Sequence, residues 1–189
     1  MIPIPDTRHE DIRAQIASLG ILQGDDPILR EEAHRVVLPD EVELAKHVLD
    51  ELMSTIRRLR GLHRFTNGVG LAAPQIGRSL SIAVVRPVGN YPVRLINPRI
   101  VSVSSQTDVQ YEGCLSFFDY RGLVRRPTSL TVECADLRGK TTLREYRGGL
   151  ARLVAHEVDH LYGRLYVDLI GDERDLVDVS VYNSRRWGS

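Results

Sequence analysis

The sequence predicts an α+β fold in which mostly antiparallel strands surround a central helix. The strands are indicated by short segments between residues 81 and 146 in which apolar and polar residues alternate. The helix is indicated by an apolar run at residues 150–155, which continues into a polar motif and ends near Gly163. Because no repeat or low-complexity linker interrupts the chain, we expect one domain.

The length and charge of the chain limit its partners. Its 189 residues are enough to bury a sizeable core, and residues 1–20 are expected to form an N-terminal extension with a short helix. The 25 basic and 25 acidic residues cancel, so the charge balance indicates neither nucleic acid nor an anionic membrane. No apolar stretch is long enough to span a bilayer, and residues 1–6 lack the features of a secretory signal. We therefore expect a cytoplasmic protein.

Two helices are predicted in the first third of the chain. Residues 9–19 have apolar side chains at helical spacing, and Gly20 ends this helix. Residues 24–27 form a turn. A long helix begins at residues 39–41 with acids in its first turn. Its apolar stripe consists of Ala45, Val48, Leu49, Leu52, Met53, Ile56 and Leu59.

A glycine-rich stretch at residues 67–77 separates the long helix from the first predicted strand. Its glycines suggest a loop whose backbone comes close to a ligand. A nucleotide-binding loop is a poor interpretation, because Pro74 interrupts the run and no phosphate-binding helix follows. A tight connection without a functional role, in which Gln75 is incidental, remains an alternative.

The strand pattern continues almost to the end of the chain. The predicted strands cover residues 81–86, 93–97, 100–104, 108–112, 123–126, 129–135 and 141–146, with a hairpin turn at 136–140. After Gly163, Val177, Val179 and Val181 alternate with polar residues. We therefore expect the chain to end in a strand and not in a helix.

Residues 156–160 read HEVDH and carry the strongest chemical signal. Two histidines four positions apart on a helix point from one face, so both imidazoles can bind one metal ion. Glu157 follows the first histidine directly, in the position that a general base for a metal-bound water needs. Two histidines with ordinary hydrogen bonds are the alternative, but the predicted helix favours a central metal-binding helix.

A catalytic site of this kind needs a third protein ligand and one open position. One zinc-peptidase group takes its third ligand from a longer motif, HExxHxxGxxH. That motif is incomplete here, because position 166 is Tyr and no histidine follows His160. Glu173 is the only glutamate downstream, and it follows at short range in an acidic turn. Cys114, which lies upstream beside Gly113, is therefore the favoured ligand.

The other cysteine, Cys134, lies in a predicted strand and is most simply a small buried residue. A stable disulfide with Cys114 is not expected in a reducing compartment. As a fourth ligand, Cys134 would close the site as a structural zinc centre, which is one rival to catalysis. We expect Asp159 to be structural and to pair with an arginine such as Arg126.

Three segments together resemble the signature motifs of the peptide deformylase family. They are GVGLAAPQ at residues 68–75, EGCLS at 112–116 and HEVDH at 156–160, in that family's order and at compatible separations. The resemblance implies a single catalytic domain over residues 1–189 that removes the formyl group from N-terminal formylmethionine and releases formate. Its expected partners are formylmethionyl nascent polypeptides, with the ribosome as a further candidate. A metallopeptidase or another small-amide hydrolase with the same water chemistry is the rival.

The resemblance also implies a metal centre. Cys114, His156 and His160 would hold one divalent ion, Fe²⁺ in the cell, although Zn²⁺, Ni²⁺ and Co²⁺ also suit these ligands. Glu157 would handle protons.

Further residues are implied to bind the substrate. Gln75 and the backbone N–H of Leu115 would bind the formyl oxygen, and Gly70 would pair with the substrate backbone. The chain departs from the family pattern at residues 117–121, which read FFDYR where many members have a small apolar residue followed by proline. We assign Phe117, Phe118 and Arg121 to the substrate rim, with strand packing as an equal alternative.

Overall fold

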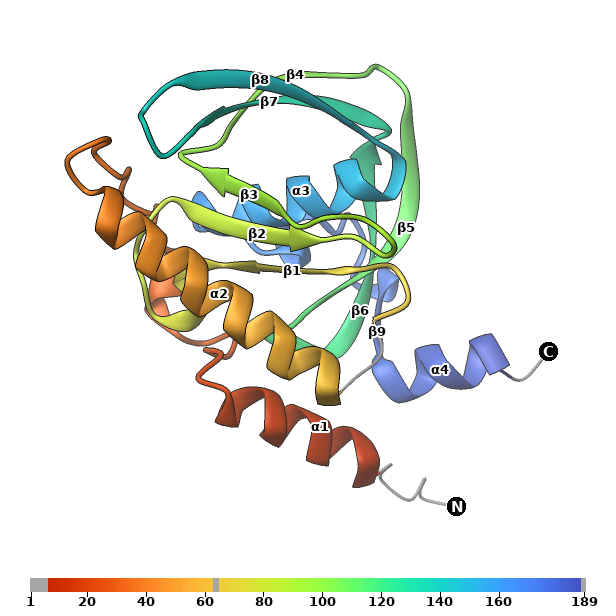
Figure 1. Cartoon of the computed structure of the whole chain (residues 1–189). Helices are drawn as coiled ribbons and strands as arrows, with labels where there is room; N and C mark the ends of the chain where they lie inside the picture. Colours follow the sequence, from red (N-terminus) through yellow and green to blue (C-terminus); the bar gives the residue numbers. More distant parts are fainter. Residues whose placement is uncertain (1–6, 63–64, 188–189) are drawn as a thin grey trace.

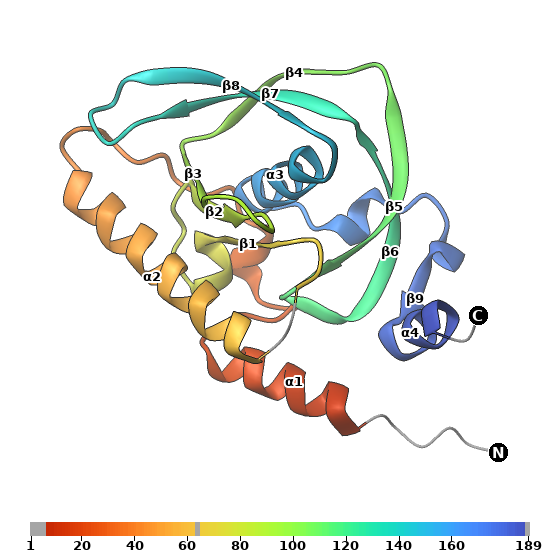
Figure 2. The same ribbon diagram turned by 45° about the vertical axis from the view of Figure 1, so that its right-hand side comes forward.

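Three antiparallel sheets of three strands surround helix α3 (Gly148–Leu161) in the computed structural model, which describes residues 7–62 and 65–187 (Figure 1). The first sheet contains β1 (Val69–Ala72), β2 (Ile82–Arg86) and β3 (Val93–Ile96). The second contains β4 (Arg99–Val103), β7 (Ser129–Ala135) and β8 (Thr141–Arg147). The third contains β5 (Thr107–Cys114), β6 (Phe117–Pro127) and β9 (Leu176–Asp178). Figure 2 shows α3 between these sheets, which confirms the predicted α+β class with a central helix.

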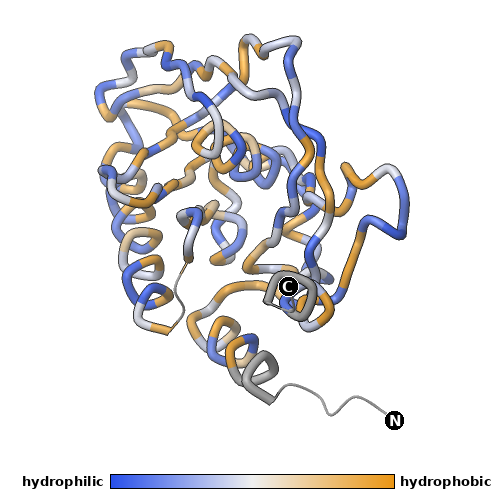
Figure 3. The backbone as a smooth tube through the Cα atoms, turned by 90° about the vertical axis from the view of Figure 1, so that its right-hand side faces the viewer, coloured by the Kyte–Doolittle hydropathy of each residue, from blue (hydrophilic) through white to orange (hydrophobic). Residues whose placement is uncertain are grey.

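The helices predicted in the first third of the chain are also confirmed. α1 spans Thr7–Ser18 and α2 spans Val42–Leu62. The apolar stripe predicted for α2 is buried in a core cluster, with Met53 partly buried against it. The alternation of polar and apolar residues along this helix is visible in Figure 3, where α2 leads into the thin grey trace. α2 therefore forms because its stripe can be buried.

The first sheet is covered by helices on both faces. On β2, Ile82 and Val84 pack in the cluster that contains α2, whereas Ala83 and Val85 pack in the cluster that contains α3. Successive side chains of a strand point to opposite faces, so the four apolar residues at 82–85 bury both faces of β2. This arrangement places β1, the neighbour of β2, beside α3 and its histidines.

The prediction that residues 67–77 form a loop was wrong. Residues 69–72 form β1, which pairs with β2 in the register Gly70↔Val85, and a 3₁₀ helix, η2 (Ala73–Ile76), follows. Glycine and alanine have low strand propensity. The strand exists because its backbone pairs with β2, and that contact is not visible in the local pattern.

The prediction of a terminal strand was also wrong beyond residue 178. β9 is short, and helix α4 (Val179–Trp187) follows it directly. The carboxylate of Asp178 accepts a hydrogen bond from the Ser180 N–H at 2.7 Å, which is a helix-capping contact. Three alternating valines were too short a pattern to exclude a helix start. The strand predicted at residues 123–126 is part of the longer β6.

The chain also contains short helical turns, and they connect the larger elements. Three further 3₁₀ helices are η1 (Pro27–Arg30), η3 (Tyr166–Leu169) and η4 (Glu173–Asp175). Among the helices of residues 7–62 and 65–187, none combines the length and the apolar surface that a bilayer crossing requires.

We expect Leu52→Ala to destabilise the protein strongly. Leu52 is fully buried in α2, and truncating such a side chain leaves a cavity that lowers the free energy of unfolding by about 2–5 kcal/mol. The matched control is Leu44→Ala in the same helix, where the side chain is 42% exposed and the expected change is within about 0.5 kcal/mol. Chemical denaturation of both variants measures the difference, and equal losses would contradict the assigned packing of α2.

Candidate metal centre and active site

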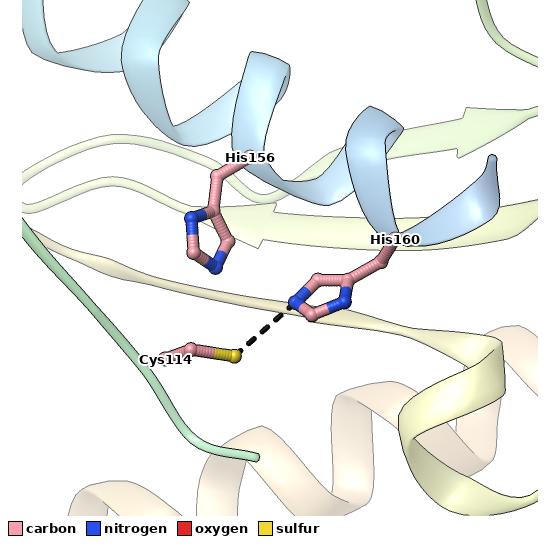
Figure 4. Close-up of side chains that lie close together, drawn as sticks. All are labelled: Cys114, His156 and His160. Atoms are coloured by element: carbon pink, nitrogen blue, oxygen red, sulfur yellow. Dashed lines mark hydrogen bonds between the residues drawn. The ribbon is translucent and has the colours of Figure 1, made fainter. Parts of the chain in front are cut away.

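Cys114, His156 and His160 converge at the end of β5 beside α3 (Figure 4). The Cys114 Sγ lies 3.2 Å from the His160 Nε2, and one ligand atom from each of the three residues lies within 4.8 Å of the others. All three side chains are buried. The two imidazoles come from consecutive turns of α3, as their spacing predicts, and the thiol comes from a strand far away in the sequence.

Local backbone geometry aims the thiol at α3. Glu112 and Cys114 are two positions apart on β5 and are both buried, so both side chains face the helix. The pairing of β5 with β6 shifts register between these two residues, and such irregularities redirect side chains near functional sites. A side chain at Gly113 would collide with the Arg121 guanidinium.

The three residues fit a divalent metal ion chemically. Burial would raise the pKa of the Cys114 thiol, but the neighbouring His160 and His156 lower it well below its usual value, and the thiolate is the form that binds metals. The His156 Nδ1 lies 3.0 Å from a Glu112 carboxylate oxygen, which leaves the Nε2 for an ion. The His160 Nδ1 is buried and has no hydrogen-bond partner within residues 7–62 and 65–187.

A buried ion network holds these ligands in place. Arg126 of β6 donates to both oxygens of Glu112, at 2.9 and 3.0 Å, and also to Asp159. Arg152 of α3 donates to Glu112 at 2.6 Å. Burial would raise the pKa of Glu112, but the hydrogen bonds from His156 and Arg126 outweigh it and hold the pKa well below its usual value. Glu112 is therefore ionised and orients His156.

This network contains one contact that the sequence suggested and two residues that it did not. The expected pairing of Asp159 with Arg126 is confirmed. No role was predicted for Glu112 or Arg152. Their only signal was the position of Glu112, two residues before Cys114 in a strand, because such residues share a face.

Glu157 lies on α3 with its carboxylate against β1. It is 3% exposed, and its Oε2 has no hydrogen-bond partner in the described part of the chain. Burial raises the pKa of Glu157 to about 7. A side chain at Gly70 would occupy the space that the Glu157 carboxylate fills, so glycine at that position leaves room for the acid.

Gln75 is buried in η2 and is held by a backbone contact. Its Oε1 accepts a hydrogen bond from the Ala72 N–H at 2.9 Å. Its Nε2 therefore points the other way, where it lies 3.1 Å from the Ser116 Oγ and 3.5 Å from the Cys114 Sγ. The Gln75 amide is thus directed at the candidate metal centre.

A cavity of about 530 Å³ opens onto these groups. Its walls include the candidate site residues Gly70, Gln75, Cys114, Leu115, Phe118, Arg121, His156 and Glu157. Val179 and Tyr182 of α4 also line it, although sequence analysis assigned them no role. The cavity therefore leads to the candidate metal centre.

Phe117 is not brought to this cavity. Its ring lies against Tyr120 and Tyr166, with centroid distances of 5.5 and 6.3 Å. The Tyr166 ring stacks in turn on His156 at 6.0 Å. Phe118, by contrast, lines the cavity, and the Arg121 guanidinium lies 5.4 Å from the centre of its ring.

Comparison with known proteins agrees with this geometry. A family model described as polypeptide deformylase matches residues 18–175. The chain belongs to the polypeptide deformylase family. Peptide deformylase 2 of Vibrio cholerae is 40% identical over 157 residues, which cover 82% of this chain and 88% of that protein. Membership in the deformylases makes the protein a metal-dependent hydrolase.

Solved deformylase structures share the fold. The crystal structure of peptide deformylase from Thermotoga maritima is 38% identical, has a TM-score of 0.69, and covers 80% of this chain and 97% of that chain. A Met-Ala-Ser-bound peptide deformylase from Acinetobacter baumannii is 32% identical with a TM-score of 0.70, and covers 79% of this chain and 96% of that chain. The matched family region ends before α4, so the contribution of α4 to the cavity lies outside it.

We expect Glu112→Gln to weaken both the fold and the metal site of this deformylase. Loss of the carboxylate leaves the buried Arg126 and Arg152 without a partner, which lowers the free energy of unfolding by about 3–5 kcal/mol. Loss of the acceptor for His156 lowers metal affinity by about 10–100-fold. Denaturation and metal titration measure the two effects.

The control for this variant is Glu133→Gln. Glu133 pairs with Arg99 on the surface, where an ion pair contributes about 0–1 kcal/mol. Unchanged metal affinity in Glu112→Gln would show that the network does not orient the ligands.

Proposed function

We propose that Glu157 transfers the proton when this deformylase hydrolyses the formyl group of an N-terminal formylmethionine. One observation carries the proposal. A buried carboxylate with an oxygen that lacks a partner among the described residues lines the same cavity as Cys114 and His156, and His160 completes their cluster. An unpaired buried carboxylate is unfavourable, so its retention indicates a role toward a ligand or a reacting water.

Cys114, His156 and His160 are the proposed ligands of one divalent ion. When bound, the ion polarises the formyl carbonyl and lowers the pKa of a water molecule. We propose Fe²⁺ as the ion in the cell, and the same ligand set accepts Zn²⁺, Ni²⁺ or Co²⁺. A thiolate beside Fe²⁺ makes the activity sensitive to oxygen.

Glu157 is the proposed general base and then the general acid. Its carboxylate takes a proton from the attacking water, and it returns that proton to the amine that leaves when the C–N bond breaks. The side chain enters from α3 next to the ligand His156, and the absence of a side chain at Gly70 leaves space for it. The products are formate and a free N-terminus.

Gln75 and the backbone N–H of Leu115 are the proposed donors to the formyl oxygen. Negative charge develops on this oxygen during attack, and a fixed donor lowers the barrier by about 3 kcal/mol. The Gln75 amide is already oriented by the Ala72 N–H, so little reorganisation is needed when the substrate binds.

β1 is the proposed docking edge for the peptide. It pairs with β2 on one side, and the cavity lies along its other side at Gly70. The backbone of Gly70 is proposed to pair with the substrate backbone as an added strand. Phe118 and Arg121 form part of the opposite wall, whereas Phe117 supports that wall through Tyr166.

Formylmethionyl nascent chains in the cytoplasm are the proposed substrates, met near the ribosome. The rival of a structural zinc centre has little support, because Cys134 lies in β7 and packs in the second core cluster. Burial raises the pKa of Cys134 to about 11, which disfavours the thiolate that a metal needs.

Replacement of Glu157 with Gln should abolish most of the activity. Anaerobic wild-type protein is expected to release formate from a formyl-Met tripeptide, and Glu157→Gln is expected to lower kcat by about 10²–10⁴-fold with its metal retained. The control is Glu173→Gln, an exposed acid that does not line the cavity. Full activity of Glu157→Gln would show that Glu157 does not carry the proton. If the wild-type protein cleaved internal peptide bonds faster than it removed the formyl group, the metallopeptidase rival would be favoured.

Gln75→Leu tests the proposed donor to the formyl oxygen. Because the donor acts on charge that develops during the reaction, we expect kcat to fall by about 10²–10³-fold with a smaller change in KM. The control is Gln106→Leu, an exposed glutamine in the turn before β5. A variant that raised KM and kept kcat would show that Gln75 serves binding alone.

A further inference from the structure

A second hollow, of about 460 Å³, adjoins the active-site cavity at the start of β1. We call it the β1 hollow, and its walls include Arg60, Phe65, Gly68, Val69 and Arg86. Phe65, Gly68 and Val69 also line the active-site cavity. The two spaces therefore share part of their walls.

The sheet register places Arg86 in this hollow. Arg86 is the last residue of β2 and pairs with Val69 of β1. Residues opposite one another in an antiparallel pair carry their side chains on the same face. Val69 packs in the cluster that contains α2, so the Arg86 side chain leaves the sheet on the α2 face. Figures 1 and 2 show the end of α2 on this side of β1.

Arg60 reaches the same hollow from α2. It follows the buried Leu59 by one position and is exposed near the C-terminal end of the helix. Two arginines, from two elements far apart in the sequence, thus line the hollow, and its walls contain no carboxylate among the described residues.

Neither of these arginines is paired with a carboxylate among the described residues, unlike Arg78 and Arg99. Arg78 and Arg99 each form an ion pair with a glutamate. For Arg60 and Arg86, residues 7–62 and 65–187 supply no ion-pair partner. Two like charges that share one hollow repel each other, and a carboxylate between them would relieve this repulsion and accept several N–H donors.

The proposed path of the substrate leads to this hollow. The formyl group lies toward Gln75, which follows the C-terminal end of β1. The peptide then runs along the edge of β1 past Gly70 and toward Gly68. An extended chain advances about 3.3 Å per residue, so a peptide whose methionine lies beside Gly70 brings its third or fourth residue to the hollow.

We propose that the β1 hollow is a subsite for an aspartate or glutamate side chain at the third or fourth position of the formylated peptide. Arg60 and Arg86 bind the carboxylate, and the Phe65 ring and Val88 contact its methylene groups. The inference rests on the proposed function and adds a sequence preference to it. A nucleic-acid phosphate is a weaker candidate, because the hollow shares its walls with the proposed peptide cavity.

The test uses two peptide series, formyl-Met-Ala-Xaa-Ser and formyl-Met-Ala-Ser-Xaa, in which Xaa is Glu, Gln or Lys. Every peptide ends in an amide, so that only the side chain supplies a carboxylate. For wild-type protein loaded with metal, we expect kcat/KM for Glu to exceed that for Gln by about fivefold in one series, mainly through KM, with Lys lowest. Raising the salt from about 0.05 to about 0.5 M should remove most of this preference.

Two variants assign the preference to the hollow. In the double variant Arg60→Gln/Arg86→Gln, the ratio of Glu to Gln should fall close to one, while turnover of the Gln peptide is kept and shows that the protein is folded. The matched control is Arg58→Gln, an exposed arginine of α2 that does not line the hollow, which should keep the ratio.

Several outcomes would overturn the inference. Equal turnover of the Glu and Gln peptides by wild type would overturn the subsite and leave the proposed function intact. A Glu-to-Gln ratio that stays unchanged in the double variant would do the same. The same holds if single-stranded RNA binds in an Arg60- and Arg86-dependent way while the peptides are not distinguished. Failure to deformylate the Gln peptide would overturn the proposed function as well.

Discussion

The rest of the structure depends on the buried ion pairs that the carboxylate of Glu112 forms. This carboxylate joins β5 to β6 through Arg126 and to α3 through Arg152 and His156, all in a buried environment. Charges in such surroundings are tolerated only when they are paired and hydrogen-bonded. The network therefore requires the third sheet and the central helix to meet in one arrangement, and that arrangement brings Cys114 to the histidines.

The position of β1 decides what can approach the candidate metal centre. The strand is covered on one side by α2 and on the other by α3, and Glu157 fills the space that a side chain at Gly70 would take. The same edge extends from Gln75 at one end to the β1 hollow at the other. A peptide that adds to this edge thus meets a donor, an acid and then two arginines in a fixed order.

Two buried polar atoms that look unfavourable in isolation belong to candidate site residues. The Glu157 Oε2 and the His160 Nδ1 are buried without hydrogen-bond partners in the described residues, in contrast to the fully paired Glu112. Folding alone gives no reason to keep such groups, because each unpaired polar atom destabilises the native state. Their position in and beside the Cys114, His156 and His160 cluster is consistent with a site arranged for a metal ion, a water and a substrate rather than for stability.

The sequence by itself determined the α+β class, the apolar stripe of α2 and the pair His156 and His160, because helical spacing is a local property that a short segment reveals. It also suggested Cys114 by elimination and the contact between Asp159 and Arg126. Only the tertiary structure decided that the glycine-rich residues 69–72 are a strand, that residues after 178 are a helix, and that Glu112 lies under His156. These features depend on pairing and burial between segments distant in the chain, and such contacts leave no periodic trace in either segment alone.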